Sequence, residues 1–463
     1  MKPAWRAVAA AAAAAVALSG SPVRAQTGSN AGIPMIRDAE IEQLLRDYTA
    51  PIFKVAGLTA QNVQVVIISD KQFNAFVMDA HRIFVNVGAL MQSTTPNQLI
   101  GVFAHECGHI VGGHLSKMRQ ELANVETATI IGMLLGAGAL AAAPHNIEMG
   151  NVGMAGILAP QALGMSTLLA YQRAQEESAD RAGVRFLTMS GQSAKGMYDT
   201  FKRFADESLF SAQGSNPYLQ NHPAPQERMA ALEELAKSSP YWNKKDSPEL
   251  QFRHDMMRAK LYGFMERPET VLRRYPATDT SLPARYARAI STYRYGDPRS
   301  ATAQIDGLIQ SMPNNPYFYE LKGQALLEGG HPADALAPLR RAVQLAPTPA
   351  LIQVLLGQAL VATNDPKSAD EAIPILRAAL VKEPEDGDAY TTLAMAFGRK
   401  NDLADADLAS AQAAFARGDN KTARELAERA KQRFPIGSPG WVRADDIVVF
   451  NKNQKTSPLR NGP

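Results

Sequence analysis

The sequence has a single cysteine, Cys107, among its 463 residues. One cysteine cannot form an intrachain disulfide, so a small disulfide-stapled scaffold is excluded. Because Cys107 lies far from the N-terminus, a lipid anchor on a cysteine close to that end is excluded as well. We interpret Cys107 as a small core residue rather than a nucleophile.

The sequence also lacks a large excess of charge of either sign. The 48 basic and 45 acidic residues give a net charge of only +3 when the histidines are neutral. Removal of residues 1–25 would take away three basic groups and no acidic ones, which leaves no net charge. The composition therefore argues against a general binder of polyanions such as nucleic acid.

Long apolar runs are rare, and the clearest one is at the N-terminus. A basic start is followed by an alanine-rich stretch from Ala7 to Leu18, and the segment Val23-Arg24-Ala25 offers small residues, Val23 and Ala25, for cleavage before Gln26. This pattern predicts a secretory signal peptide over residues 1–25. The alternative is an uncleaved anchor, for which the apolar core is short.

The most informative feature that the sequence does have is the motif His105-Glu106-Cys107-Gly108-His109. Two histidines four residues apart lie on one face of a helix, so both imidazoles can bind one zinc ion. Glu106 could then take a proton from a water activated by the ion and pass it to the leaving amine. The alternative is two hydrogen-bonded core histidines beside a surface glutamate.

The flanking residues predict a buried helix around this motif. Thr95 can cap the helix, Pro96 suits its first position and Gln98 can complete a capping box. Apolar residues then recur at Leu99, Ile100, Val102, Phe103, Ile110 and Val111. His114 follows His105 by nine residues, which on a continuous helix places it on the opposite face. We interpret His114 as a structural or surface histidine and not as a ligand.

A catalytic zinc needs a third protein ligand. Glu176 and Asp180 are four apart in a second segment with helical spacing, so they share a face. We predict that Glu176 binds the metal and that Asp180 accepts a hydrogen bond from a metal-binding histidine. The alternative is an ordinary charged helix face with Arg173 and Arg181. His222 lies in a proline-flanked loop before a helix near Gln226, and its spacing fits a turn residue as well as a fourth ligand.

These motifs resemble peptidase family forty-eight of the metallopeptidases, which includes the HtpX and CAAX prenyl endopeptidases. The resemblance covers residues 35–235: it includes the motif at 105–109, Glu176-x-x-x-Asp180-Arg181, the strand-like stretches 74–77 and 83–88, and His222-Pro223 with Arg228. Its nearest type is the periplasmic group that enhances β-barrel assembly.

The resemblance implies one zinc ion bound by His105, His109 and Glu176, with Glu106 as the catalytic base. It also implies that His222 can fill the remaining metal position in a self-inhibited resting state. Asp180 and Arg228 are expected to belong to the site, although the resemblance leaves the role of Arg228 open.

Two further stretches allow more than one interpretation. Residues 82–87 alternate like a strand, which could be an edge that aligns an extended substrate or an internal strand. Residues 127–166 contain two weakly polar runs rich in Gly, Ala and Met. They predict a helical hairpin near the site, with 149–166 as a mobile loop or plug and a possible peripheral contact with a membrane.

The C-terminal half has a repeat. Gly296 and Gly330 are 34 residues apart, and the same spacing separates three more pairs: Pro298 and Pro332, Pro313 and Pro347, Gly323 and Gly357. This is the tetratricopeptide period, and it predicts about four helical units, the first and last atypical. A helical bundle without repeats is the alternative. Stacked repeats form a surface for protein partners.

Together these observations predict a mainly α fold of the α+β class. A signal peptide (1–25) precedes a zincin-type metalloprotease domain with a small β-sheet (26–245), an all-α solenoid of tetratricopeptide repeats (250–435) and a flexible tail (436–463). The expected function is a periplasmic zinc endopeptidase of the gluzincin type that degrades misfolded or misassembled envelope proteins. Its partners would be those proteins and the outer-membrane β-barrel assembly complex. A non-proteolytic assembly adaptor with a silent or structural metal site is the alternative.

Overall fold

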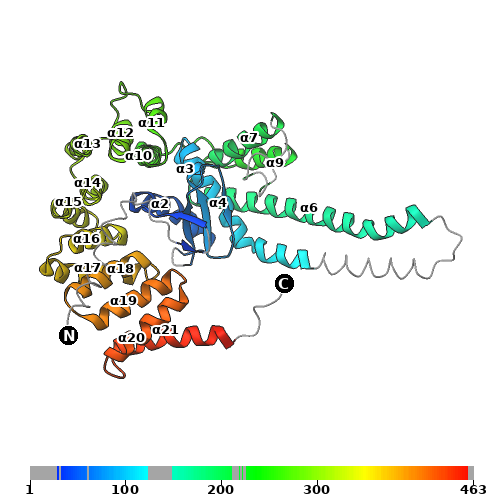
Figure 1. The fold of residues 1–463 in the computed structure, drawn as a ribbon. Coiled ribbons are helices and arrows are strands. Elements are labelled where there is room, and N and C mark those ends of the chain that lie inside the picture. Colours follow the sequence, from blue (N-terminus) through cyan, green and yellow to red (C-terminus); the bar gives the residue numbers. More distant parts are fainter. Residues whose placement is uncertain are drawn as a thin grey trace. The chain divides into compact units, whose positions relative to one another are not determined.

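The computed structural model describes residues 29–30, 33–59, 62–123, 149–210, 218, 222 and 226–456 (Figure 1). For 29–33, 149–168, 208–210 and 451–456 the side chains are not described. The expected signal peptide lies outside the described residues. The chain divides into two compact units. Ile41–Leu261 forms the first, which we call the sheet unit; Tyr262–Pro463 and the residues up to Glu40 form the second, which we call the repeat unit.

The sheet unit contains a small sheet and several helices. Helix α2 begins in the repeat unit and continues into the sheet unit, and α10 ends beyond it. The elements are α2 (Ala39–Ala56), β3 (Gln64–Ile68), β4 (Ala75–Val77), β5 (Arg82–Asn86), α3 (Val87–Gln92), α4 (Pro96–Gly112), α6 (Met149–Met189), α7 (Lys195–Phe210), α9 (Gln226–Lys237) and α10 (Pro248–Met265).

Strand β5 is an internal strand of the sheet and lies between β3 and β4. It pairs in parallel with β3, with Val66 opposite Phe84, and antiparallel with β4, with Phe76 opposite the same residue. The interpretation of residues 82–87 as an edge is therefore wrong, because both sides of β5 are already hydrogen-bonded. The buried side chains of Ile83, Phe84 and Val85 agree with an internal position.

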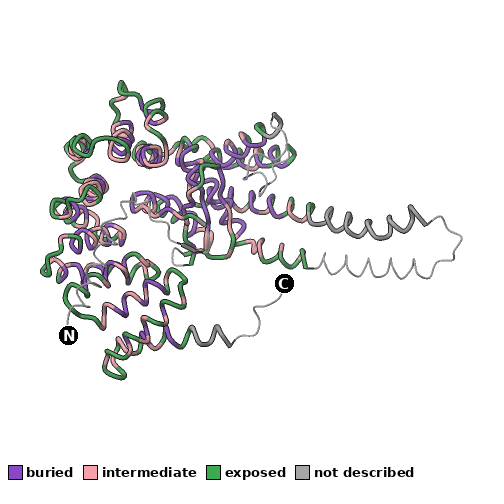
Figure 2. Tube along the Cα trace, in the orientation of Figure 1, coloured by how far each residue is buried: buried purple, intermediate pink, exposed green. Residues whose placement is uncertain are grey.

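Helix α4 follows the sheet and is almost wholly buried (Figure 2). Thr95 is its N-cap, Pro96 its first residue, and the Gln98 side chain accepts a hydrogen bond from the backbone N–H of Thr95 at 3.4 Å. Gly108 faces α6 so closely that a Cβ atom there would lie 2.8 Å from the carbonyl oxygen of Ala179. This close approach brings the two helices that carry the sequence motifs together.

Helix α10 is fastened to the segment that leads into α4. His254 is fully buried; its Nε2–H donates to the carbonyl oxygen of Ser93 at 3.0 Å, and its Nδ1 accepts from the Tyr48 hydroxyl at 2.9 Å. Arg258 donates to the carbonyl oxygen of Met91 at 3.1 Å. The compact unit therefore extends beyond residue 245, the expected end of the first domain.

His254 predicts a loss of stability in acid. Burial lowers its pKa from 6.5 to about 4. As the pH falls below about 6.5 the unfolded chain takes up a proton that the folded chain does not. Above that pH, His254 therefore causes no loss of stability. Between about pH 6.5 and pH 4, protonation of the unfolded chain at His254 lowers the free energy of unfolding by about 3 kcal/mol. Urea unfolding of the sheet unit at several pH values should give a flatter pH profile for His254→Gln. The exposed His331→Gln is the control, and an unchanged profile for His254→Gln would contradict the assignment.

Residues 149–166 do not form the expected loop or plug. They are the first half of α6, a continuous helix of 41 residues. The run at 127–143 lies outside the described residues, and the expected membrane contact there stays a prediction. None of the helices described for this chain has the length and apolarity needed to cross a bilayer.

The repeat unit is a stack of antiparallel helix pairs after a short strand pair. Helices α12, α14 and α16 begin at residues 282, 316 and 350, which reproduces the 34-residue period of the sequence. The elements are β1 (Ser29–Asn30), β2 (Ile33–Ile36), α11 (Pro268–Arg274), α12 (Leu282–Tyr295), α13 (Pro298–Ser311), α14 (Pro316–Glu328), α15 (Pro332–Leu345), α16 (Ala350–Ala362), α17 (Pro366–Lys382), α18 (Gly387–Arg399), α19 (Leu403–Ala416), α20 (Asn420–Arg433) and α21 (Pro439–Thr456).

Small residues bring the paired helices into close contact. A Cβ atom on Gly323 would meet the Leu339 side chain at 2.3 Å, and one on Gly357 would meet Leu376 at 2.6 Å. These equivalent glycines explain why the period is visible in the sequence. The fold is thus mainly α, with a small sheet followed by an all-α solenoid, as predicted.

The tail from residue 436 is not wholly irregular. Helix α21 forms there, and Ala444, Ile447 and Val448 bury their side chains against Leu408 and Ala427 of the preceding helices. Polar residues dominate this stretch, which is why composition predicted a flexible tail, but three apolar residues on one face are enough to dock the helix.

Candidate metal centre

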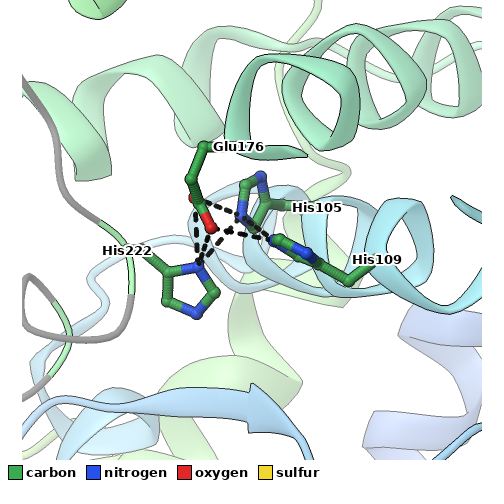
Figure 3. A group of neighbouring side chains, drawn as sticks. All are labelled: His105, His109, Glu176 and His222. Atoms are coloured by element: carbon green, nitrogen blue, oxygen red, sulfur yellow. Dashed lines mark hydrogen bonds and ion pairs between the residues drawn. The ribbon is translucent and has the colours of Figure 1, made fainter. Parts of the chain in front are cut away.

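Four side chains from three parts of the sheet unit converge on one point (Figure 3). His105 and His109 come from α4, Glu176 from α6, and His222 from the segment before α9. All four side chains are buried, and their donor atoms lie within 4.8 Å of one another. The structure therefore brings together all four residues that the sequence analysis named as metal ligands.

The spacing of these donors suits a tetrahedral cation. Nε2 of His105 lies 3.0 Å from Nε2 of His109 and 3.3 Å from Nδ1 of His222. The Glu176 carboxylate oxygens lie 3.2 Å from Nδ1 of His222 and 3.4 Å from each of the other two imidazoles. Bond lengths of 2.0–2.1 Å around tetrahedral zinc imply ligand separations of about 3.3 Å, so these residues fit a metal ion of that size.

The charges also favour a divalent cation. Glu106, Glu176 and Asp180 place three carboxylates in the buried site, and among the described residues Arg228 is the one guanidinium that pairs with them there. With neutral imidazoles the group carries an excess of two negative charges. Such an excess is costly in a buried site unless a cation compensates for it.

Glu106 is fully buried and lacks a hydrogen-bond donor. Among the described residues, none donates to either of its carboxylate oxygens, and Nε2 of His222 lies 3.4 Å from Oε1. Burial raises the pKa of Glu106 above its ordinary value. A buried carboxylate with a raised pKa beside the donor cluster is suited to accept and return a proton.

Asp180 and Arg228 contact two of the converging residues, His105 and Glu176. Asp180 Oδ1 lies 2.9 Å from Nδ1 of His105, and Arg228 donates to both oxygens of Asp180 at 2.6 and 2.9 Å. Arg228 also lies 2.9 Å from Glu176 Oε2. Asp180 thus lies beside the His105 nitrogen that faces away from the cluster, and its role in orienting His105 stays a prediction. Arg228, for which the sequence gave no role, pairs with both carboxylates.

The pKa shifts follow from these contacts. Burial lowers the pKa of His105, but the hydrogen bond to Asp180 and the Glu176 carboxylate outweigh burial and raise the pKa to about 9. Burial raises the pKa of Glu176, yet the neighbouring His222 and His105 lower it well below its ordinary value. For His109, burial and the His105 charge lower the pKa. The cluster therefore favours carboxylate anions and a shared positive charge, which a metal ion would supply.

His222 is a buried, packed residue and not an exposed turn residue. Its side chain is buried, and its ring lies 4.7 Å from the Tyr218 ring, centre to centre. With Nδ1 toward Glu176 and Nε2 toward Glu106, the imidazole stands between the donor cluster and the buried carboxylate. The arrangement favours the fourth-ligand interpretation that the sequence left open.

His114 is placed differently from the prediction. Helix α4 ends at Gly112, and Gly113 adopts a left-handed φ of 62°, so the chain turns before His114. His114 is therefore buried, with its Nδ1 3.0 Å from Nδ1 of His109. The expectation of an opposite helix face is wrong because it assumed an uninterrupted helix. That His114 is not a metal ligand stays a prediction.

Sequence reasoning also missed the aromatic packing of the site. The Phe201 ring of α7 lies 5.0 Å from the His105 ring in an edge-on arrangement, and Tyr218 and Phe204 pack beside it. Through these contacts an aromatic cluster packs against the His105 ring. Single aromatic residues at helical spacing gave no signal that distinguished them from ordinary core residues.

The sequence is similar to a family of peptidases and to several named proteins. Residues 36–236 match the model of peptidase family M48. The chain is 24% identical over 420 residues to the Beta-barrel assembly-enhancing protease of Yersinia pestis, which covers 90% of this chain and 84% of that protein. It is 23% identical over 422 residues to the protein of the same name in Escherichia coli (strain K12), over 89% and 83% of the two chains. Among solved structures, MamA 41-end from Desulfovibrio magneticus RS-1 matches 38% of this chain and 97% of its own length, at 18% identity and a TM-score of 0.30.

Proposed function

We propose that this chain, whose residues 36–236 match the model of peptidase family M48, is a periplasmic zinc endopeptidase that degrades misfolded or misassembled envelope proteins. The observation that carries the proposal is the buried group of His105, His109, Glu176 and His222 next to the carboxylate of Glu106, to which no described residue donates a hydrogen bond. Two imidazoles and a carboxylate in a near-tetrahedral set are the donors that zinc takes in hydrolytic sites.

Each residue of the site has a part in the proposed reaction. His105, His109 and Glu176 would hold the zinc, which supplies a Lewis acid for the scissile carbonyl when it is bound. Glu106 takes a proton from the attacking water and delivers it to the leaving amine, for which its raised pKa is suited. Asp180 keeps the proton of His105 on Nδ1, and Arg228 holds both supporting carboxylates.

The substrate would be extended polypeptide. Among the described strands of the sheet unit, β4 is hydrogen-bonded only to β5, so β4 rather than β5 is the strand to which a substrate could be added. Backbone pairing of this kind recognises exposed unfolded chain and does not depend on side chains. It therefore suits removal of proteins that have failed to assemble.

The names of the relatives suggest where such substrates arise. Proteins named for β-barrel assembly match about 90% of this chain, repeats included. We therefore propose outer-membrane β-barrel proteins and their assembly complex as partners. A non-proteolytic adaptor is the second candidate, since repeats alone serve that role. Incubation of the purified chain and of its His222→Ala variant with an unfolded outer-membrane protein distinguishes the two: fragments support the peptidase, and their absence from both samples favours the adaptor.

His114 is expected to strengthen metal binding. For His109 to bind a metal through Nε2, its Nδ1 must carry the proton and donate to His114. The variant His114→Ala removes that acceptor and should weaken zinc binding about 10–100-fold in a competition with a chelator. His114→Asn offers an oxygen acceptor and should recover part of the affinity, whereas the exposed His331→Ala should have no effect. Equal affinity of His114→Ala and the unchanged protein would exclude this role.

A further inference from the structure

Residues just before the sheet unit in the sequence contact the helices of the repeat unit. Residues 37–40 connect β2 to the first turn of α2, and they cluster with the repeat unit rather than with the sheet unit. Their side chains contact residues of several helix pairs. This segment therefore behaves as a short ligand of the solenoid, although it belongs to the same polypeptide.

Both charged ends of the segment have partners. Arg37 Nη2 lies 2.9 Å from Oε1 of Glu383, the residue that follows α17. The buried Glu40 accepts a hydrogen bond from the hydroxyl of Tyr286 in α12 at 2.9 Å. Arg37 and Glu40 are only three residues apart, whereas their partners Glu383 and Tyr286 are about one hundred residues apart in the chain.

Between them, Ala39 fills an apolar site. Its side chain is 2% exposed and packs against Ala342 and Ile352. Partly buried side chains complete this site: Tyr317, Tyr319, Val343, Ala346 and Leu351. A larger or charged side chain at position 39 would not fit, because a methyl group already closes the cluster.

We propose that this surface, formed by Tyr286, Tyr317, Ile352 and Glu383 and called here the repeat face, is a recognition site for a protein segment. Its ligand carries a cation, a small apolar residue two positions later and then a carboxylate. Residues 37–40 occupy the repeat face in cis, and a partner with the same pattern competes with them. Helices α12, α14 and α16, the first helices of successive pairs, all contribute, as in the surfaces that solenoids use for protein partners.

Peptide binding to the full chain tests the proposal. The probe is a fluorescent peptide of residues 33–40, measured by anisotropy. Arg37→Glu opens the cis contact without burying a charge, since Arg37 and Glu383 are 29% and 35% exposed. Ala39→Arg opens it more completely. We expect both variants to bind the probe more tightly than the unchanged chain, at least about ten-fold for Ala39→Arg if the cis segment fills the face more than about nine-tenths of the time.

A charge reversal identifies the face. In the Ala39→Arg chain, Glu383→Arg should weaken binding of the probe about two- to five-fold and improve binding of a probe with Arg37→Glu. Glu371→Arg, in α17 and paired with Arg340, is the matched control and should change neither. The proposal is overturned if Arg37→Glu binds the probe no better than the unchanged chain, or if Glu383→Arg and Glu371→Arg behave alike. This result is independent of the metal centre, so failure here leaves the proposed peptidase untouched.

Discussion

Replacement of Glu106 by glutamine is expected to reduce peptide hydrolysis by about 10²–10⁴-fold. Glutamine keeps the shape of the side chain but cannot accept the proton of the attacking water. Because Glu106 is not among the four converging donors, the variant should bind as much zinc as the unchanged protein. Hydrolysis is measured as fragments of an unfolded outer-membrane protein, and zinc by elemental analysis of the same samples.

The control for this prediction is Glu177→Gln. Glu177 stands next to Glu176 on α6 but is half exposed and paired with Arg181. It should retain full activity. Activity that survives in Glu106→Gln, with zinc bound, would show that another group acts as the base.

Replacement of His222 by alanine is expected to raise hydrolysis. In the structure its imidazole lies 3.2 Å from Glu176 and 3.4 Å from Glu106, so it occupies the space that a water or a substrate carbonyl needs. If this closed arrangement is populated more than about nine-tenths of the time, its removal increases the active fraction at least about ten-fold. Initial rates of the two proteins at equal zinc occupancy measure the effect.

Two comparisons make the His222 prediction specific. His331→Ala changes an exposed histidine of the repeat unit and should leave the rate unchanged. The double variant Glu106→Gln, His222→Ala should be as inactive as Glu106→Gln alone, since opening the site cannot replace the base. A slower His222→Ala variant with full zinc would mean that His222 assists the reaction and does not inhibit it.

The residues of the candidate metal centre were largely predictable because they obey helical spacing. His105 and His109, and likewise Glu176 and Asp180, are four apart on helices whose ends and apolar faces are visible in the sequence. That two such faces meet was an inference from chemistry, since zinc needs a third ligand. The close approach at Gly108 is the physical reason that they do.

What the sequence did not reveal depends on single backbone angles and on distant contacts. The left-handed Gly113 ends α4 and redirects His114 to His109, which no periodicity predicts. The position of β5 inside the sheet depends on which strands pair, and a five-residue alternating pattern is the same at an edge and in the middle.

Contacts between remote segments explain the remaining differences. His254 attaches α10 to the sheet unit through Tyr48 and Ser93, more than 150 residues away. Similarly, Arg37 joins the repeat unit through Glu383. Neither residue stands out locally, because a histidine or an arginine on a helix or loop is usually solvated. The 34-residue period, in contrast, repeats the same local contacts and is visible in the sequence alone.

The most direct test of the account is the zinc content of the purified protein beside its Glu176→Ala and Glu177→Ala variants. The two glutamates are neighbours on α6, yet only Glu176 faces the histidines. We predict one zinc per chain in the unchanged protein and in Glu177→Ala, and little or none in Glu176→Ala after dialysis. Zinc retained at one equivalent by Glu176→Ala, or absent from the unchanged protein, would contradict a metal centre built from His105, His109 and Glu176.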